Sequence, residues 1–402
     1  MMKKVLLFAF VVLTVLFIGT EFSYSIQQGR IYGRVYVRNG EVFEGRIKWG
    51  DHETIWDDMF DGETEFYSRY KYYKDNYPER KWRIRRGGYV TVQTSFKFGR
   101  IMWIKRKYKD LALVKLKDGR EIEVKGGDAE DEDVTVNDID FGDVVVKWRR
   151  IEKVEFMDEP ESYSKLNPER NHPLYGTVET EEGDKFRGYI MWDNDESLSD
   201  DILDGEDDDG FKRKIRFEKI SEIEKISRNE VRVTLKSGRK IYLTGSNDVN
   251  SDNRGILIKD PDYGNVKLRW REFYRVTFED SIKVKRYSDF EKGYPLYGTV
   301  FTIDGDSIEG YIRWDDDESY SCDILNGEYD RYIMEIEFGK IKEIRRRSRR
   351  ACIVVLKNGI ELELRGSNDV NNENKGIIVF EKPDSKEGEY IDWRDFSRVV
   401  FR

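Results

Sequence analysis

Short runs in which apolar and polar residues alternate dominate the chain. Val231, Val233 and Leu235 alternate with polar neighbours. After a turn at Ser237–Gly238, the alternation resumes at Ile241. A period of two places every second side chain on one face of a β-strand. No segment after residue 25 keeps the spacing of an amphipathic helix for three turns, so the pattern predicts an all-β fold of short antiparallel strands.

The chain also repeats itself at a period the size of a domain. Three motifs recur in a second and a third copy, at 175–178 and 297–300, at 245–249 and 366–370, and at 270–273 and 393–396. A weaker first copy begins at Tyr32 and keeps Trp49 and Trp148. Self-similarity of this kind indicates a tandem array. We therefore predict three repeat units, at residues 26–158, 159–290 and 291–402.

The N-terminus has the order of a secretory signal peptide. Two lysines precede an apolar stretch at 5–18, and small residues at 23 and 25 offer a cleavage site before Ile26. The stretch is shorter than the roughly 20 residues that a membrane-spanning helix needs. We predict a signal peptide at residues 1–25, no transmembrane span in the mature chain, and an exported protein that is periplasmic, cell-surface or secreted. An N-terminal anchor that is not cleaved is the alternative.

Each unit divides into two halves with a similar order of strands and turns. In the third unit, the segments VVLKNGIELELRGSNDVN (354–371) and GDSIEGYIRWDDDE (305–318) resemble the first motif of Sm-like proteins. The resemblance implies that each half is a small, strongly bent SH3-like barrel, giving six barrels in three pairs. Sm-like proteins often bind RNA. We do not expect nucleic acid as a partner here, because export and a net charge of −9 both disfavour it.

Composition narrows the possible chemistry. The 24 Tyr, 22 Phe and 9 Trp among 402 residues exclude a disordered chain. Two His and two Cys are too few for a zinc site or a His-based triad in each unit, or for a disulfide scaffold. No nucleophile elbow, P-loop or metalloprotease motif is present.

Carboxylates gather in the loops that follow the strand-ending tryptophans of the second and third units. Such loops can supply the oxygen ligands that Ca²⁺ requires, although their spacing is not that of an EF-hand. Ordinary solvated turns are the alternative. The candidate calcium ligands are Asp193, Asp195, Glu196, Asp201, Asp315, Asp317, Glu318 and Asp323.

Two Asn-Asp pairs follow a glycine at matching places, Asn247-Asp248 and Asn368-Asp369. Their side chains can accept hydrogen bonds from nearby backbone N–H groups and so support a turn. A role in ligand binding is the other interpretation.

The first unit carries an insertion rich in aromatic rings and cations near residues 64–90. Aromatic rings interleaved with arginine can stack on sugars and attract anions. An exposed hairpin without a ligand is an equally good interpretation. The candidate ligand-binding residues are Tyr70, Tyr72, Tyr73, Trp82, Arg83 and Arg85.

Both cysteines, Cys322 and Cys352, lie in the third unit. In an exported protein they can form a disulfide between the halves of that unit. Cys352 lies in a predicted strand, so a buried thiol is the alternative.

These observations lead to one hypothesis with two alternatives. The protein is expected to be a non-enzymatic, extracytoplasmic binding or scaffold protein of the cell envelope, with an envelope polymer or a protein as its partner. The first alternative is a carbohydrate-active or other hydrolase that uses the acidic-loop carboxylates. The second is a calcium-stabilised adhesion module.

Overall fold

The computed structural model describes residues 29–402, apart from 68–88, 169–170, 280–284, 384 and 386. The described part of the chain is all-β, as the alternating pattern predicts. It contains thirty strands and one short α-helix, α3 (Glu161–Leu166). Within this part, no helix has the length and apolar character needed to cross a membrane. The predicted signal peptide lies outside the described residues.

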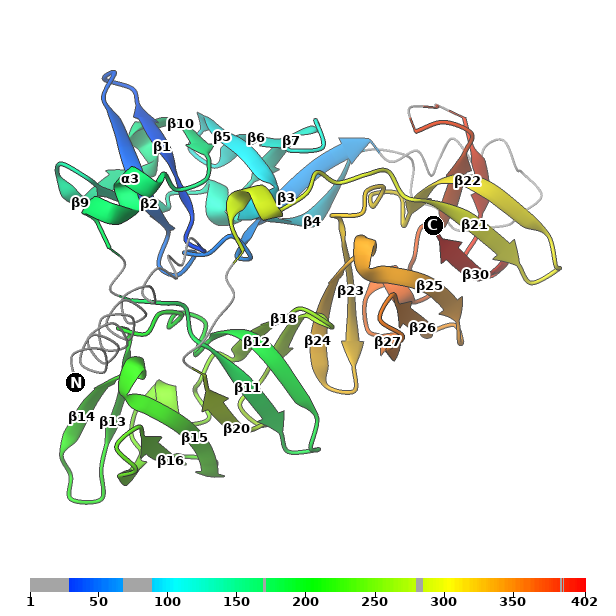
Figure 1. The fold of residues 1–402 in the computed structure, drawn as a ribbon. Coiled ribbons are helices and arrows are strands. Elements are labelled where there is room, and N and C mark those ends of the chain that lie inside the picture. The colour runs from blue at the N-terminus through cyan, green and yellow to red at the C-terminus, as the bar shows by residue number, and fades with distance from the viewer. Residues whose placement is uncertain (1–28, 68–88, 169–170, 280–284, 384, 386) are drawn as a thin grey trace, which may run out of the picture.

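The first ten strands pair into one open antiparallel sheet, which we term unit 1 (Figure 1). Its strand order is β4-β3-β7-β6-β5-β10-β1-β2-β8-β9, so that β4 and β9 form its two ends. The bounds are β1 (Tyr32–Val37), β2 (Val42–Trp49), β3 (Met59–Tyr67), β4 (Tyr89–Lys97), β5 (Ile101–Tyr108), β6 (Leu111–Leu116), β7 (Glu121–Lys125), β8 (Asp133–Asp138), β9 (Gly142–Lys147) and β10 (Ile151–Phe156).

The next ten strands repeat this order in unit 2. The β13–β14 hairpin meets β17 through an isolated bridge between Glu206 and Thr244. The bounds are β11 (Tyr175–Thr180), β12 (Lys185–Met191), β13 (Ile202–Glu206), β14 (Lys212–Arg216), β15 (Ile220–Ser227), β16 (Glu230–Leu235), β17 (Lys240–Leu243), β18 (Ile256–Asp260), β19 (Gly264–Leu268) and β20 (Phe273–Phe278).

The last ten strands repeat the order again in unit 3. A strand of unit 1 thus has counterparts numbered ten and twenty higher. The bounds are β21 (Tyr297–Thr302), β22 (Ser307–Trp314), β23 (Ile324–Tyr329), β24 (Tyr332–Glu337), β25 (Ile341–Arg346), β26 (Ala351–Leu356), β27 (Glu361–Arg365), β28 (Ile377–Phe380), β29 (Glu389–Ile391) and β30 (Phe396–Phe401).

The strand pairing does not follow the predicted division of each unit into two successive barrels. In unit 1, β1 pairs with the last strand, β10, and β2 pairs with β8, so the two sequence halves interleave in one sheet. Units 2 and 3 do the same. The physical reason is that a period-two pattern fixes which face of a strand is buried but not which strand lies beside it. The likeness to Sm-like proteins stays a prediction.

A pair of tryptophans anchors the core of each unit. Trp49 and Trp314 end the second strand of their units, Trp192 directly follows β12, and all three are fully buried. Each packs edge-on against the tryptophan that precedes the last strand, with ring centroids 5.9 to 6.1 Å apart. Each also donates its indole N–H to a loop carbonyl, of Asp128, Asp248 and Asp369 respectively. The indole N–H is satisfied by this bond, which also holds two loops together.

Units 2 and 3 share one continuous sheet. The end strand β19 of unit 2 pairs antiparallel with the end strand β24 of unit 3, with Val266 opposite Met334. This pairing satisfies the backbone groups on one edge of each unit.

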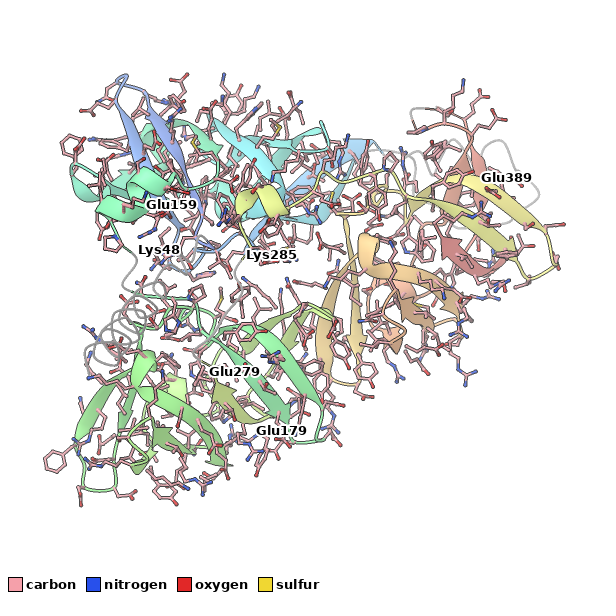
Figure 2. All side chains as sticks on the ribbon, in the orientation of Figure 1. Lys48, Glu159, Glu179, Glu279, Lys285 and Glu389 are labelled. Atoms are coloured by element: carbon pink, nitrogen blue, oxygen red, sulfur yellow. The ribbon has the colours of Figure 1, made fainter. Side chains whose placement is uncertain are left out.

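Unit 1 meets the other two units through buried charges. The Lys259 ammonium of unit 2 forms an ion pair with the Asp58 carboxylate of unit 1, and both side chains are almost fully buried. Lys97 lies 3.0 Å from Asp57 and 3.4 Å from Glu337 of unit 3. Lys285, labelled in Figure 2 where the units meet, lies 3.3 Å from Asp57. Unit 1 supplies charges of both signs to this network, unit 2 supplies two cations and unit 3 supplies a carboxylate.

Removing one partner of this network should weaken the whole assembly. Lys259→Ala leaves the Asp58 carboxylate buried without its cation, which typically costs about 3–5 kcal/mol. We expect a clear loss of melting temperature in thermal unfolding of the full chain. Lys240→Ala, an exposed lysine of the same unit, is the matched control. Equal losses in the two variants would contradict a stabilising role for the buried pair.

Candidate functional site

The acidic loops of units 2 and 3 are tight turns with the same geometry. Each begins at the buried tryptophan, which forms an isolated bridge with the glutamate four residues on, Glu196 or Glu318. The two residues after each tryptophan have positive φ angles, between 47° and 76°. Asn and Asp tolerate this left-handed conformation better than most residues do. The local sequence therefore suits a turn that brings its carboxylates close together.

Two of the eight predicted calcium ligands accept hydrogen bonds from the backbone of the loop. The Asp201 carboxylate accepts hydrogen bonds from the N–H groups of Ser197 and Leu198, at 2.8 and 2.7 Å. Asp323 accepts the corresponding bonds from Ser319 and Tyr320, both at 2.8 Å. Asp58 does the same in unit 1. Because the position has this role in all three units, Asp201 and Asp323 hold the turn.

The first aspartate of each loop has a cationic neighbour. Asp193 is fully buried and accepts hydrogen bonds from the Arg254 backbone and guanidinium and from the Asn247 amide. Its counterpart Asp315 accepts the corresponding backbone and amide bonds, from Lys375 and Asn368. Gly50 stands at this position in unit 1. The described loops of units 2 and 3 thus share a buried carboxylate that unit 1 lacks.

The remaining carboxylates of the loops are crowded. In unit 2, one oxygen from each of Asp193, Asp195 and Glu196 lies within 4.8 Å of the others. One oxygen of Asp195 (Oδ1) and one oxygen of Glu196 (Oε2) are buried without a hydrogen-bond partner. Burial, a hydrogen bond with Asp195 and the negative charge of Asp248 raise the pKa of Glu196 to about 10. This cluster is therefore suited to holding a proton or a cation.

Unit 3 repeats the arrangement with deeper burial. One oxygen each of Asp317 and Glu318 is buried without a hydrogen-bond partner. Burial and the charge of Asp315 raise the pKa of Asp317 to about 8. Burial and the charge of Asp317 raise the pKa of Glu318 well above its usual range. Glu318 is only 9% exposed, so its carboxyl group is held in a largely dry environment.

The unit 3 loop faces a cleft of about 770 Å³ between units 1 and 3. Strands β3 and β4 supply the wall on the unit 1 side, and Lys267 of unit 2 reaches the same space. Across the junction, the Arg120 guanidinium lies 2.7 Å from the Asp323 carboxylate. The charged residues that line the cleft are Asp61, Asp316, Asp317, Glu318, Asp323, Glu335, Arg120, Lys267 and Arg313.

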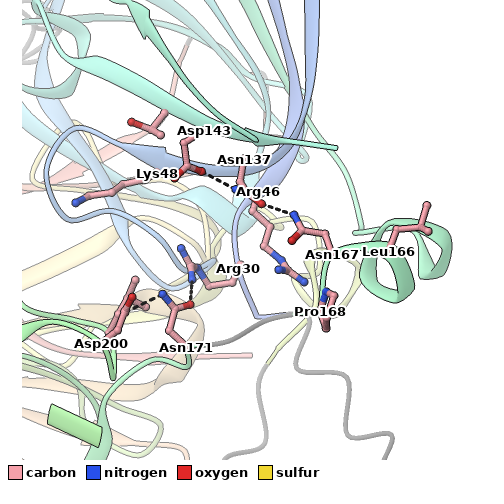
Figure 3. A pocket seen from close by; sticks show the side chains of 12 residues that line it. Arg30, Arg46, Lys48, Asn137, Asp143, Leu166, Asn167, Pro168, Asn171 and Asp200 are labelled. Carbon is pink, nitrogen blue, oxygen red and sulfur yellow. Dashed lines mark hydrogen bonds between the residues drawn. The ribbon is translucent and has the colours of Figure 1, made fainter. Parts of the chain in front are cut away.

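A second cleft, of about 550 Å³, lies between units 1 and 2 (Figure 3). Arg30, Arg46 and Lys48 line it on the unit 1 side. Arg46 is held by a bidentate ion pair with the buried Glu159, at 2.7 and 2.8 Å. Arg30 donates to Asn171, which donates in turn to Asp200. Because these hydrogen bonds join units 1 and 2, much of the polar lining of the cleft stabilises the contact between the two units.

The Asn-Asp loops have the structural role that one interpretation predicts. Asp248 accepts a hydrogen bond from the Asp204 backbone, and Asp369 accepts one from the Asn326 backbone, both at 2.6 Å. Burial and the charge of the nearby first aspartate raise the pKa of Asp248 to about 6 and of Asp369 to about 7. Both carboxyls therefore add to the acidic clusters while holding the loops.

Two other predictions concern the insertion and the cysteines. The candidate ligand-binding residues of the insertion lie outside the described residues: Tyr70, Tyr72, Tyr73, Trp82, Arg83 and Arg85. The predicted disulfide is absent, because Cys322 and Cys352 are free, buried thiols.

The two thiols have separate surroundings. Cys322 lies beside Asp118 and Arg120 of unit 1. Cys352 lies on the buried face of β26, in the core of unit 3.

Sequence reasoning missed the cations of the acidic loops. Arg254 and Lys375 precede a glycine at matching places of two repeats, and that correspondence is the signal that could have found them. Arg120 and Lys267 gave no such signal, because they reach the unit 3 cleft from other units.

No family model, no curated protein and no solved structure matches this chain.

Asp128 of unit 1 allows a test of whether its surroundings keep a carboxyl group protonated in the folded chain. Burial and the charge of Glu53 raise the pKa of Asp128 to about 8. A raised folded-state pKa gives stability that is present below the unfolded pKa, near 4, and is lost as pH rises toward 8. Asp128→Asn should therefore gain stability over the natural chain between pH 4 and 8, by about 1 kcal/mol or more. Asparagine keeps the oxygen that accepts the Asp61 N–H.

The measurement is the melting temperature at both pH values for the natural chain and the variant. Glu130→Gln, an exposed acid of the same unit, is the control. A variant with the same pH dependence as the natural chain would show that Asp128 is not protonated in the folded state.

Proposed function

We propose that this protein is a non-enzymatic, extracytoplasmic binding or scaffold protein, and that the cleft between units 1 and 3 is its binding site. The observation that carries the proposal is the Glu318 carboxyl group, which lines this cleft and has a buried oxygen without a hydrogen-bond partner. A buried polar atom without a partner costs about 1–3 kcal/mol, so a ligand that supplies the missing bond gains that amount.

The chemistry of the cleft indicates the class of ligand. The raised pKa values of Asp317 and Glu318 favour carboxyl groups that both donate and accept hydrogen bonds. Arg120, Lys267 and Arg313 supply further donors on the rim. Hydroxyl and amide groups of an envelope polymer match this mixture of donors and acceptors. An open cleft of about 770 Å³ accepts a short segment of such a polymer.

A hydrolase is less well supported by the same residues. A glycosidase needs one carboxylic acid and one ionised carboxylate on opposite sides of the scissile bond. Asp317 and Glu318 are adjacent in one turn, and the pKa values of both are raised. Their arrangement therefore lacks the division of roles that acid–base catalysis requires.

The test is binding of the mature protein to solubilised envelope polymer fragments in a pull-down assay. Glu318→Gln keeps the size of the side chain but removes its acidic proton, and we expect about tenfold weaker retention, since 1.4 kcal/mol corresponds to a factor of ten. Glu373→Gln, an exposed glutamate of the same unit, should retain the fragments normally. Equal retention by both variants would overturn the assignment of the cleft, and release of cleaved fragments would favour the hydrolase.

Calcium binding is a second candidate, favoured by the crowded oxygens of Asp193, Asp195 and Glu196. Arg254 already forms ion pairs with Asp193 and Asp195, so a calcium ion must displace this guanidinium. We expect a bound ion to raise the melting temperature in millimolar calcium over that in EDTA. Glu196→Gln should reduce this rise. Equal melting temperatures in calcium and EDTA would count against calcium.

A further inference from the structure

The contact between units 2 and 3 has a clear set of parts. Strand β24 pairs with β19, and Asn265 lies opposite Glu335. Tyr332, at the start of β24, is buried against Phe186 of unit 2, with ring centroids 5.6 Å apart. Phe186 also packs edge-on against Tyr263, at 5.2 Å. One aromatic side chain of unit 3 thus inserts beside an aromatic pair of unit 2.

Unit 1 carries the counterpart of the unit 2 side of this contact, and no described strand pairs with it. Phe43 and Phe141 stand at the positions of Phe186 and Tyr263 and also pack edge-on, at 6.2 Å. Phe141 is nevertheless 73% exposed, and Val145 of β9 is 58% exposed. Strand β9 pairs with β8 and ends the sheet in the described part of the chain. We term β9 with Phe43 and Phe141 the β9 face.

Unit 2 carries the counterpart of the unit 3 side, also uncovered. Phe211 stands at the position of Tyr332, directly before β14, and is 59% exposed. Among the described strands, β14 pairs with β13 alone. We term β14 with Phe211 the β14 face. An exposed aromatic side chain beside an unpaired strand edge marks a candidate interaction surface.

The two uncovered faces fit each other in side-chain chemistry. The Tyr332 hydroxyl bonds to Thr180 and Asp184, both at 3.0 Å. Phe211 has no hydroxyl, and the position of Thr180 is taken in unit 1 by the apolar Val37. The position of Asp184 is taken in unit 1 by Glu41, so the contact becomes less polar on both sides of the pairing while one carboxylate remains.

The faces also fit in charge and backbone geometry. In the register of the observed contact, Asp143 of β9 lies opposite Lys214 of β14, and Val145 lies opposite Lys212, whose aliphatic stem can cover it. Gly264 allows β24 to approach closely, because a Cβ there would lie 2.5 Å from the Glu335 carbonyl. Gly142 keeps this glycine, with positive φ and open space around it.

We propose that the β9 face of one molecule binds the β14 face of a second copy of this chain, in the same way that β19 binds β24. Within one chain the two faces do not pair, since β9 and β14 end separate sheets. A contact between two different faces is heterologous, and it closes into a ring or continues as a linear chain of molecules. The contact deepens the proposed scaffold role and rests on it, but it uses surfaces away from the unit 3 cleft.

The test is the oligomeric state of the full mature chain by sedimentation velocity over a wide range of concentration. We expect self-association, and about tenfold or greater weakening in either Phe141→Asp or Phe211→Asp, since a buried aromatic residue at the centre of an interface typically contributes at least this much. An equimolar mixture of the two variants should form a dimer, because each variant keeps the face that the other has lost.

Controls separate this result from misfolding and from failure of the cleft proposal. Tyr108→Asp changes an aromatic residue that is 68% exposed and outside both faces, and should associate normally. Phe211→Asp should keep the natural circular dichroism spectrum and bind envelope fragments as before. A natural chain that stays monomeric, unaffected association in both variants, or a mixture that stays monomeric would each overturn the proposal.

Discussion

Strand edges are the constraint on which this architecture depends. Each unit is an open sheet, and an open sheet leaves a row of unpaired backbone N–H and C=O groups at both ends. Within each unit, the first strand lies between the second and the last, as β1 lies between β2 and β10, so its backbone groups are paired on both sides. Between units 2 and 3, the pairing of β19 with β24 satisfies the backbone groups on one edge of each unit. The edges that remain in the described part of the chain are on β4, β9, β14 and β29, and exposed phenylalanines lie beside β9 and β14.

The contacts between units depend on two kinds of interaction, strand pairing with aromatic packing and buried ion pairs. The β19–β24 contact depends on backbone pairing and aromatic packing, which change little with salt. The contacts of unit 1 depend on buried ion pairs such as Asp58–Lys259 and Lys97–Asp57, whose net contribution is small but whose disruption is costly. Charged junctions of this kind specify one arrangement of the units, since a shift would leave a charge unpaired.

The sequence was sufficient for the fold class, because the alternation that indicates strands is a local property. Alternation at positions such as Val231 and Val233 predicts strands wherever they pair, and matching tryptophans mark matching strands. Strand partners could not be predicted, because alternation does not select a neighbour. The same limit explains the disulfide, since two cysteines in one unit need not be neighbours in space. It also explains Arg120 and Lys267, which reach the unit 3 cleft from other units.

The acidic loops were predicted correctly in place, but their burial was not apparent from sequence. Dense carboxylates in a turn are expected to be solvated, yet Asp193, Asp315 and Glu318 are buried. Burial raises the pKa of Asp315 to about 6 and that of Glu318 well above its usual range, and burying such acids costs stability at neutral pH. Unit 1 avoids part of this cost with Gly50, which shows that the fold does not require a carboxylate at that position. The cost in units 2 and 3 is therefore not a consequence of forming the turn but of the side chains that these two loops carry.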